Sequence, residues 1–205
     1  ELTANMIRAA VRAGVKHIVY VGSWTVHCPE ASPEIASRFV PSEELLKTLG
    51  DAGQVGWTSL RSGFFFGNFV NILGPGLKIG DVKFPNCEFA ACDPGDMGRV
   101  AAALVTGGEL EKHHEMCYDI SGPEIMTIEQ VTSKIATAIG KDDVKFEHLR
   151  PEEATFLPPF LRTLFVYMYS KGRDAVPFSD ATKRLCGEHT SLDVWLENNK
   201  SKFIA

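Results

Sequence analysis

Helix-like and strand-like segments alternate along the first sixty residues, and this order constrains the fold more than any other feature. Apolar residues recur at helical spacing over residues 2–14 and again over residues 32–49, where we expect a kink at Pro41. Residues 18–21 are apolar without alternation, which indicates a strand covered on both faces. With a second strand at residues 55–61, the order predicts a doubly wound parallel α/β sheet.

The second of these strands ends in a corner that could form part of a ligand site. Ser62 and Gly63 break the strand after Arg61, and three phenylalanines follow at residues 64–66. In open α/β sheets, ligands bind beyond the carboxyl ends of the strands. The corner is therefore a candidate wall of a cofactor pocket, and an ordinary turn with core phenylalanines is the alternative.

The later segments give weaker patterns. Gly74-Pro75-Gly76 indicates a turn, and Thr127 with Gln130 forms a capping box that predicts a helix start. Ser32 is expected to cap the helix that follows it. The other predicted elements are strands at residues 82–84, 88–91, 118–121 and 144–149, and helices at residues 97–106, 127–139, 151–171 and 191–202.

Composition excludes several classes of protein. The 205 residues carry a net charge of −5 and no basic run, which argues against general binding to nucleic acid or to a membrane surface. No apolar run approaches membrane-spanning length. The five cysteines form no CxxC pair, which fits neither a disulfide framework nor a metal site and indicates a reducing compartment. We expect a cytoplasmic protein, with the nucleus as an alternative location.

Six segments together resemble the NmrA-like proteins, which are atypical members of the short-chain dehydrogenase/reductase superfamily. The resemblance implies a Rossmann-like NAD(P)-binding domain over residues 1–140, with interleaved lobe segments, and a smaller, mostly helical C-terminal lobe over residues 141–205. The segments are Asn5-Met-Ile-Arg-Ala-Ala-Val-Arg-Ala-Gly-Val-Lys-His-Ile-Val-Tyr-Val-Gly-Ser23, Ser42-Glu-Glu-Leu-Leu46, Trp57-Thr-Ser-Leu-Arg-Ser-Gly-Phe-Phe65, Asp96-Met-Gly-Arg-Val-Ala-Ala-Ala-Leu104, Tyr118-Asp-Ile-Ser-Gly-Pro-Glu124 with Thr127-Ile-Glu-Gln130, and Leu192-Asp-Val-Trp-Leu-Glu197.

The glycine-rich loop that binds the pyrophosphate in this family does not occur in these residues. The nearest match, Gly74-Pro-Gly-Leu-Lys-Ile-Gly80, has Ile79 where GxGxxG requires glycine. The chain also starts at Glu1 within a helical pattern, so we expect a longer native polypeptide. The resemblance implies NADP, or else NAD, as cofactor of the complete protein, and weak or no dinucleotide binding by the 205 residues alone.

The resemblance also assigns residues to the expected cleft. Glycine lets a backbone approach a ring closely, and a phenylalanine can cover the ring's face. The residues expected to contact the ribose and nicotinamide are Gly22, Ser23, Ser62, Gly63, Phe64 and Phe65. The residues expected in the substrate pocket are Trp24, Phe66 and Asn68, and helix capping is an alternative role for Asn68.

The catalytic set of the wider superfamily is incomplete. Its enzymes use a serine after this strand and a Tyr-xxx-Lys pair on the next helix. Ser23 stands in the serine position, but the next helix has no tyrosine, and Phe39 and Glu43 occupy the approximate register of the pair. His27 is a second candidate acid. The pair formed by Tyr167 and Lys171 lies far along the chain, and we interpret it as chance.

Two functions follow from these features. The first is a dinucleotide-responsive regulator, or redox sensor, in which NAD(P)(H) changes the binding of a regulatory protein partner, with a homodimer as a further expectation. The absent Tyr-xxx-Lys pair favours it because binding needs no proton donor. The alternative is an NAD(P)H-dependent oxidoreductase for an apolar or aromatic molecule such as a quinone, and a chain without independent function is a third option.

Overall fold

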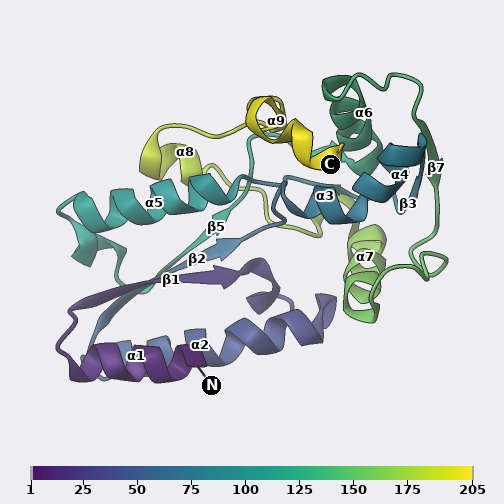
Figure 1. The fold of residues 1–205 in the computed structure, drawn as a ribbon. Helices are drawn as coiled ribbons and strands as arrows, with labels where there is room; N and C mark the ends of the chain where they lie inside the picture. The colour runs from purple at the N-terminus through teal and green to yellow at the C-terminus, as the bar shows by residue number, and fades with distance from the viewer. Residues whose placement is uncertain (1, 205) are drawn as a thin grey trace.

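The computed structural model describes residues 2–204 and contains a three-stranded parallel sheet (Figure 1). Glu1, on which the expectation of a longer polypeptide partly rests, lies outside the described residues. The strands lie in the order β1-β2-β5, with Ile18 opposite Trp57 and Leu60 opposite Tyr118. All pairings are parallel, which confirms the predicted sheet type. The strands are β1 (His17–Ser23), β2 (Gly56–Ser62) and β5 (Met116–Ile120).

Helices cover both faces of this sheet (Figure 1). On one face, Ile7 of α1 and Leu46 of α2 form a buried cluster with Tyr20 and Trp57. On the other face, α5 and α8 form a cluster around Leu60. Burial of such apolar side chains is the main force that holds the helices on the sheet. The four helices are α1 (Leu2–Arg12), α2 (Pro33–Asp51), α5 (Pro94–Thr106) and α8 (Ala181–Cys186).

β1 forms one edge of this sheet within the described part of the chain. It pairs with β2 on one side, and its other side carries no strand among residues 2–204. Val21 is 46% exposed. The expected cover over both faces of this strand is therefore incomplete, because the helices do not enclose Val21.

A second region lies beyond the carboxyl ends of the large sheet and contains two small sheets (Figure 1). β3 pairs with β7 in parallel, and β4 pairs with β6 antiparallel. Its strands are β3 (Asp81–Phe84), β4 (Glu88–Phe89), β6 (Met126–Thr127) and β7 (Lys145–His148). Its helices are α3 (Asn68–Ile72), α4 (Gly74–Ile79), α6 (Ile128–Ala138), α7 (Pro159–Lys171) and α9 (Leu192–Asn199). Short 3₁₀ helices are η1 (Trp24–Val26), η2 (Pro29–Ala31), η3 (Leu110–His113), η4 (Gly172–Asp174) and η5 (Lys200–Phe203).

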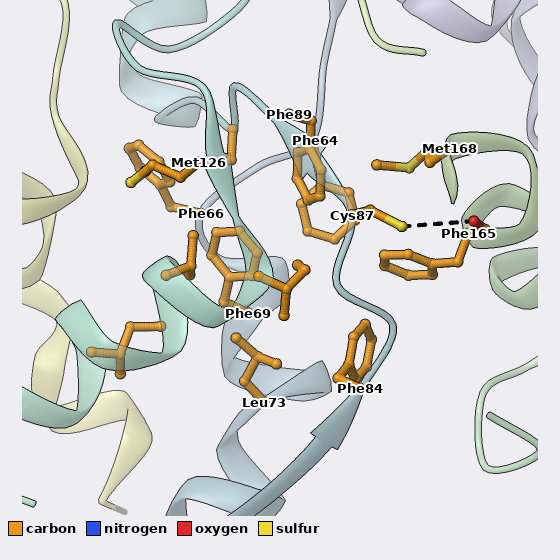
Figure 2. Close-up of a cluster of buried hydrophobic side chains, with 14 of the residues drawn as sticks. Phe64, Phe66, Phe69, Leu73, Phe84, Cys87, Phe89, Met126, Phe165 and Met168 are labelled. Carbon is orange, nitrogen blue, oxygen red and sulfur yellow. Dashed lines mark hydrogen bonds between the residues drawn. The ribbon is translucent and has the colours of Figure 1, made fainter. Parts of the chain in front are cut away.

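An aromatic core holds the second region together (Figure 2). The ring of Phe64 lies 5.1 Å from that of Phe89 and 5.4 Å from that of Phe69, and the ring of Phe84 lies 5.1 Å from that of Phe165. Such pairs add stability beyond the area that they bury. Because Phe64 directly follows the corner after β2, this core fixes the corner relative to α7.

Two local predictions need correction. Gly74-Pro75-Gly76 is not a turn but the start of helix α4, which ends at Gly80 with a left-handed φ of 79°. Pro75 suits the first turn of a helix, where no amide hydrogen is needed, and the buried Leu77 anchors the helix to the core. The helix predicted from residue 151 begins only at Pro159, after a proline at its N-cap.

Helix-start signals had mixed outcomes. Thr127 and Gln130 form the predicted capping box with reciprocal hydrogen bonds of 3.1 and 2.9 Å. Ser32 occupies the N-cap of α2, but its hydroxyl donates to the carbonyl of Phe160 on α7 (3.4 Å) instead of capping the helix. Pro41 lies inside α2, which continues through it.

Within residues 2–204, no helix has the length and apolar character needed to cross a membrane.

Candidate functional site

A cavity of about 460 Å³ lies beyond the carboxyl ends of β1 and β2, where a sheet of this kind binds ligands. Its walls come from the strand ends, α2, α3 and α7, so segments more than a hundred residues apart meet there. The lining residues are Ser23, Trp24, Thr25, Ile35, Arg38, Phe39, Ser62, Gly63, Phe64, Asn68, Asn71, Ile72, Phe160, Leu161 and Leu164.

The corner after β2 is held by its backbone. The amide of Gly63 donates to the carbonyl of Ile120 (3.0 Å), and the amide of Cys92 donates to the carbonyl of Phe64 (2.8 Å). The Ser62 hydroxyl donates to the carbonyl of Gly22 in β1 (3.0 Å). These bonds satisfy the buried polar groups and fix the shape of the wall. The corner is therefore preorganised without a ligand.

Ser23 is buried at the end of β1 and lines the cavity. Its hydroxyl oxygen accepts hydrogen bonds from the amide (3.3 Å) and the hydroxyl (3.0 Å) of Thr25. Both bonds use the oxygen as acceptor, so the hydroxyl hydrogen of Ser23 can be donated to a ligand.

The side chain of Arg61 lies on the face of β2 opposite that of Ser62, and it binds Glu43 of α2. The guanidinium donates to both carboxylate oxygens of Glu43, with Nε 3.1 Å from Oε2, and the Ser59 hydroxyl donates to the same oxygen at 2.7 Å. Burial alone would raise the pKa of Glu43, but the hydrogen bonds from Arg61 and Ser59 and nearby positive charge lower it below its ordinary value. The pair joins α2 to β2.

His27 belongs to this charged network and not to the cavity lining. Its Nε2 lies 3.2 Å from Asp119 Oδ1 and 2.7 Å from Arg61 Nη1. Its side chain is 44% exposed. His27 therefore makes a surface contact beside the Glu43–Arg61 pair.

The structure brings six of the expected site residues together and places the others elsewhere. Gly22 faces Ser59 and Glu43 and does not line the cavity. Phe65 forms an isolated β-bridge with Cys92. Phe66 is fully buried, with its ring 5.8 Å from that of Trp195. Asn68 is the first residue of α3, after Gly67 at the N-cap. The six that line the cavity are Ser23, Trp24, Ser62, Gly63, Phe64 and Asn68.

One wall of the cavity was not predicted from the sequence. Phe160, Leu161 and Leu164 line it from α7, and Arg38 of α2 lies 5.9 Å above the ring of Phe160. Phe39, in the approximate register of the superfamily's tyrosine, also lines the cavity, so that position offers no hydroxyl. The Phe- and Leu-rich pattern of residues 159–164 was the available signal, but it did not show which surface these residues would face.

Tyr167 lies behind this wall. The ring of Tyr167 packs 6.3 Å from that of Trp24, and Lys171 Nζ lies 5.9 Å from the Tyr167 ring. Burial, with a hydrogen bond to Cys28, raises the pKa of Tyr167 to about 12.

Among residues 2–204, no group of three or more His, Cys, Asp or Glu side chains is arranged to hold a metal ion.

Comparison with other sequences finds relatives among reductases, while no model of a protein family matches the chain. The chain is 30% identical over 149 residues to a (4-alkanoyl-5-oxo-2,5-dihydrofuran-3-yl)methyl phosphate reductase of Streptomyces griseus, covering 71% of this chain and 50% of the relative. It is 24% identical over 156 residues to an NAD(P)H azoreductase of Xenophilus azovorans, covering 75% and 51%. The chain thus spans about half the length of these relatives.

Solved structures with the same fold include reductases and an epimerase. An NADPH-dependent quinone oxidoreductase of Escherichia coli superposes with a TM-score of 0.75 at 22% identity, covering 95% of this chain and 71% of that one. The triphenylmethane reductase of a Citrobacter species, complexed with NADP(H), gives 0.74 at 20% identity, with 95% and 69% covered. A nucleoside-diphosphate-sugar epimerase of Staphylococcus aureus gives 0.74 at 20% identity, with 96% and 70% covered.

At these identities the solved structures establish the fold and nothing finer. The parallel sheet, the helices on both faces and the cavity at the strand ends agree with the fold class expected from the sequence. The chain therefore has a Rossmann-like α/β fold, which it shares with these reductases and this epimerase.

Proposed function

We propose that this protein is an NAD(P)H-dependent reductase of the NmrA-like type that acts on an apolar or aromatic molecule such as a quinone. The observation that carries the proposal is the preorganised cavity beside Ser62 and Gly63, at the strand ends where this fold binds ligands. Its volume of about 460 Å³ is within the range of small-molecule sites. The two reductases with related sequences support the same reaction class.

The residues on the cavity fit the nicotinamide end of a dinucleotide. A Cβ atom added at Gly63 would have no protein atom nearer than 3.5 Å, so the protein itself gives no steric reason for glycine there. Room for a ring against the backbone supplies one. Phe64 and Trp24 offer faces for flat ligands. NADP is proposed ahead of NAD because one structural neighbour is an NADPH-dependent enzyme and another is complexed with NADP(H).

Quinone reduction is compatible with the absent tyrosine. A bound NAD(P)H would supply a hydride, and one proton completes the balance: quinone, NAD(P)H and a proton become hydroquinone and NAD(P)⁺. Ser23 can donate a hydrogen bond to the quinone oxygen as negative charge develops on it, and the proton itself can come from water. A substrate whose product is a weakly basic oxyanion needs no strong acid in the protein.

The test is the oxidation of NADPH with menadione as acceptor, on the protein purified from its natural source and on variants of it. We expect turnover that falls at least about tenfold in Ser23→Ala, because one hydrogen bond to the developing oxyanion is lost. Ser37→Ala, on the exposed part of α2, is the matched control and should retain full activity. No oxidation of NADPH at saturating menadione would contradict the proposal.

Binding by the 205 residues alone is a separate prediction. No GxGxxG loop occurs in them, so we expect weak or no affinity for NADPH. Calorimetric titration of this chain measures the affinity directly. A dissociation constant near 1 μM, about −8 kcal/mol, would contradict the prediction.

A dinucleotide-responsive regulator is the second candidate. Phe39 favours it because the cavity has no hydroxyl at the approximate position of the superfamily's acid. In this function NADPH binds without turnover and changes the affinity for a regulatory protein partner, and the protein itself is proposed to form a homodimer. Sedimentation of the natural protein with and without NADPH tests this. Steady turnover of menadione, or identical sedimentation in both samples, would exclude the regulator.

A further inference from the structure

A second cavity, of about 620 Å³, adjoins the first. It lies under α4 and extends to the start of β3, where it faces the segment that leads into α7. Its lining residues are Asn71, Ile72, Leu73, Pro75, Gly76, Ile79, Asp81, Val82, Lys83, Phe156, Leu157, Pro158 and Leu161.

Both cavities lie between the same two stretches of chain. One wall of each comes from residues 68–83, and another comes from residues 156–164. Asn71, Ile72 and Leu161 belong to both linings, so the cavities meet at these three side chains. Together they form a groove that runs from the Ser62–Gly63 corner along α3 and α4 on one side and α7 on the other.

The far part of the groove is apolar and open. Ile79 is 79% exposed and Phe156 is 58% exposed, and both line it. Large apolar side chains in one cavity are costly to leave in water unless something covers them. The Phe156 ring packs 5.9 Å from that of Phe84, which places it against the aromatic core. This part of the groove therefore suits an apolar occupant.

The charged groups at its rim are already paired. Lys83 Nζ lies 2.5 Å from Glu147 Oε2 and 4.0 Å from Asp81 Oδ2. A charged ligand group would have to compete with these carboxylates. The occupant that matches this lining is consequently an uncharged chain of methylene or isoprenoid units.

We propose that the second cavity is a subsite for the alkyl or isoprenoid tail of a substrate whose ring occupies the first cavity. The nature of the ring rests on the proposed function, whereas the tail subsite rests on the shared lining and its apolar character. The ring lies in the first cavity beside the nicotinamide position at the Ser62–Gly63 corner, and the tail crosses Ile72 and Leu161 and ends between Ile79 and Phe156. Chain length, more than ring substitution, then sets the preference among substrates.

The experiment compares two uncharged fluorescent probes, dansylamide and N-decyl dansylamide, in the absence of NAD(P)H. Each buried methylene contributes about twofold to fourfold in affinity, so burial of about half of the decyl chain should make this probe bind on the order of a hundredfold more tightly. The two probes should displace each other, since both heads need the first cavity. Fluorescence titration of the natural protein gives both dissociation constants.

Two variants localise the tail. Ile79→Asp places a charge in the far part of the groove, and Leu161→Trp fills the junction of the cavities; each should reduce the advantage of the decyl probe at least about tenfold. Val105→Asp is the matched control, because Val105 is 60% exposed on the remote helix α5. It should leave both affinities unchanged. Circular dichroism of each variant confirms that it folds.

The possible results separate the two proposals. Equal binding of the two probes, no binding of either, or a decyl advantage that survives in both Ile79→Asp and Leu161→Trp would overturn the tail subsite. Failure of the proposed function would be seen instead as absent NADPH oxidation with menadione, and it would leave the probe affinities as they are. Titration without cofactor therefore tests the subsite on its own.

Discussion

Arg61 and Ser62 are neighbours in β2, but their side chains lie in two different environments. Arg61 belongs to a charged network in which its guanidinium donates to Glu43 and contacts His27, while the Ser59 hydroxyl donates to Glu43. Ser62 and Gly63 face an open cavity whose walls are mostly apolar. The charged side of the strand end thus stabilises the fold, and the apolar side is free to bind a ligand.

The comparison shows why charge alone is a poor guide to the site. A buried carboxylate, an arginine and a histidine at the end of a strand have the composition of a catalytic centre. Here each has a partner, and none of the three lines the cavity. Variants of the two sides should therefore affect stability and ligand binding separately.

The largest expected effect is on the charged side. Glu43→Ala leaves the guanidinium of Arg61 buried without its partner, which we expect to lower the free energy of unfolding by about 3 kcal/mol. Glu44→Ala, at the exposed neighbouring position on α2, is the control and should change it by less than about 0.5 kcal/mol. Urea denaturation measures both. Equal effects of the two variants would show that the pair has no structural role.

Two glycines sharpen the contrast. A Cβ atom at Gly122 would overlap the carbonyl oxygen of Ala91, so Gly122→Ala should destabilise the protein by about 2 kcal/mol. Gly63→Ala has room within the protein and should leave stability almost unchanged, while it reduces turnover of NADPH with menadione if a ring contacts this backbone. Thermal unfolding and the NADPH assay measure the two effects. Full activity in Gly63→Ala would contradict the nicotinamide assignment of this corner.

The pH dependence of stability follows from Glu43. Its pKa in the folded protein is lowered, so its contribution is present above the ordinary value of 4.5 and is lost as the pH falls through the lower folded-state value. Glu43→Gln removes this titration. The difference in unfolding free energy between the natural protein and Glu43→Gln should therefore shrink in acid, and denaturation at a series of pH values measures it. A difference that stays constant below pH 4.5 would contradict the assignment.

A small effect on stability is also expected for Arg38, the charged residue on the cavity side. Its salt bridge with Glu34 is exposed and spans one helical turn, so Arg38→Ala should cost less than about 0.5 kcal/mol. Because Arg38 lines the cavity, the same variant should alter the affinity for dansylamide. Arg12→Ala, on the remote helix α1, provides the control. Unchanged affinity in Arg38→Ala would remove Arg38 from the ligand site.

Local signals predicted the sheet and the position of the corner. Unbroken apolar residues in β1 predicted a parallel sheet between helices, although the described helices leave Val21 uncovered, and helix periodicity set the order of the elements. The capping box at Thr127 was confirmed because both of its hydrogen bonds lie within four residues. The break at Ser62 and Gly63 marked the end of β2, since neither residue depends on a distant partner to end the strand.

Other features had no local signal. Gly74–Ile79 has the composition of a turn, but Leu77 gains more by burial in the aromatic core, and the segment forms α4. Phe64 and Phe66 have identical side chains two positions apart. One lines the cavity, while the other packs against Trp195, which lies more than a hundred residues away.

The sequence by itself determined the class of the fold, the parallel strands and the corner at which a ligand could bind, because periodicity, capping and chain breaks act over a few residues. The tertiary structure alone decided that Arg61 turns away to Glu43, that α7 supplies a wall of the cavity, and that a second apolar cavity continues the first. These three features depend on contacts between distant segments. The free energy of burial in such contacts exceeds local preferences, and the contacts produce no periodic pattern in the sequence.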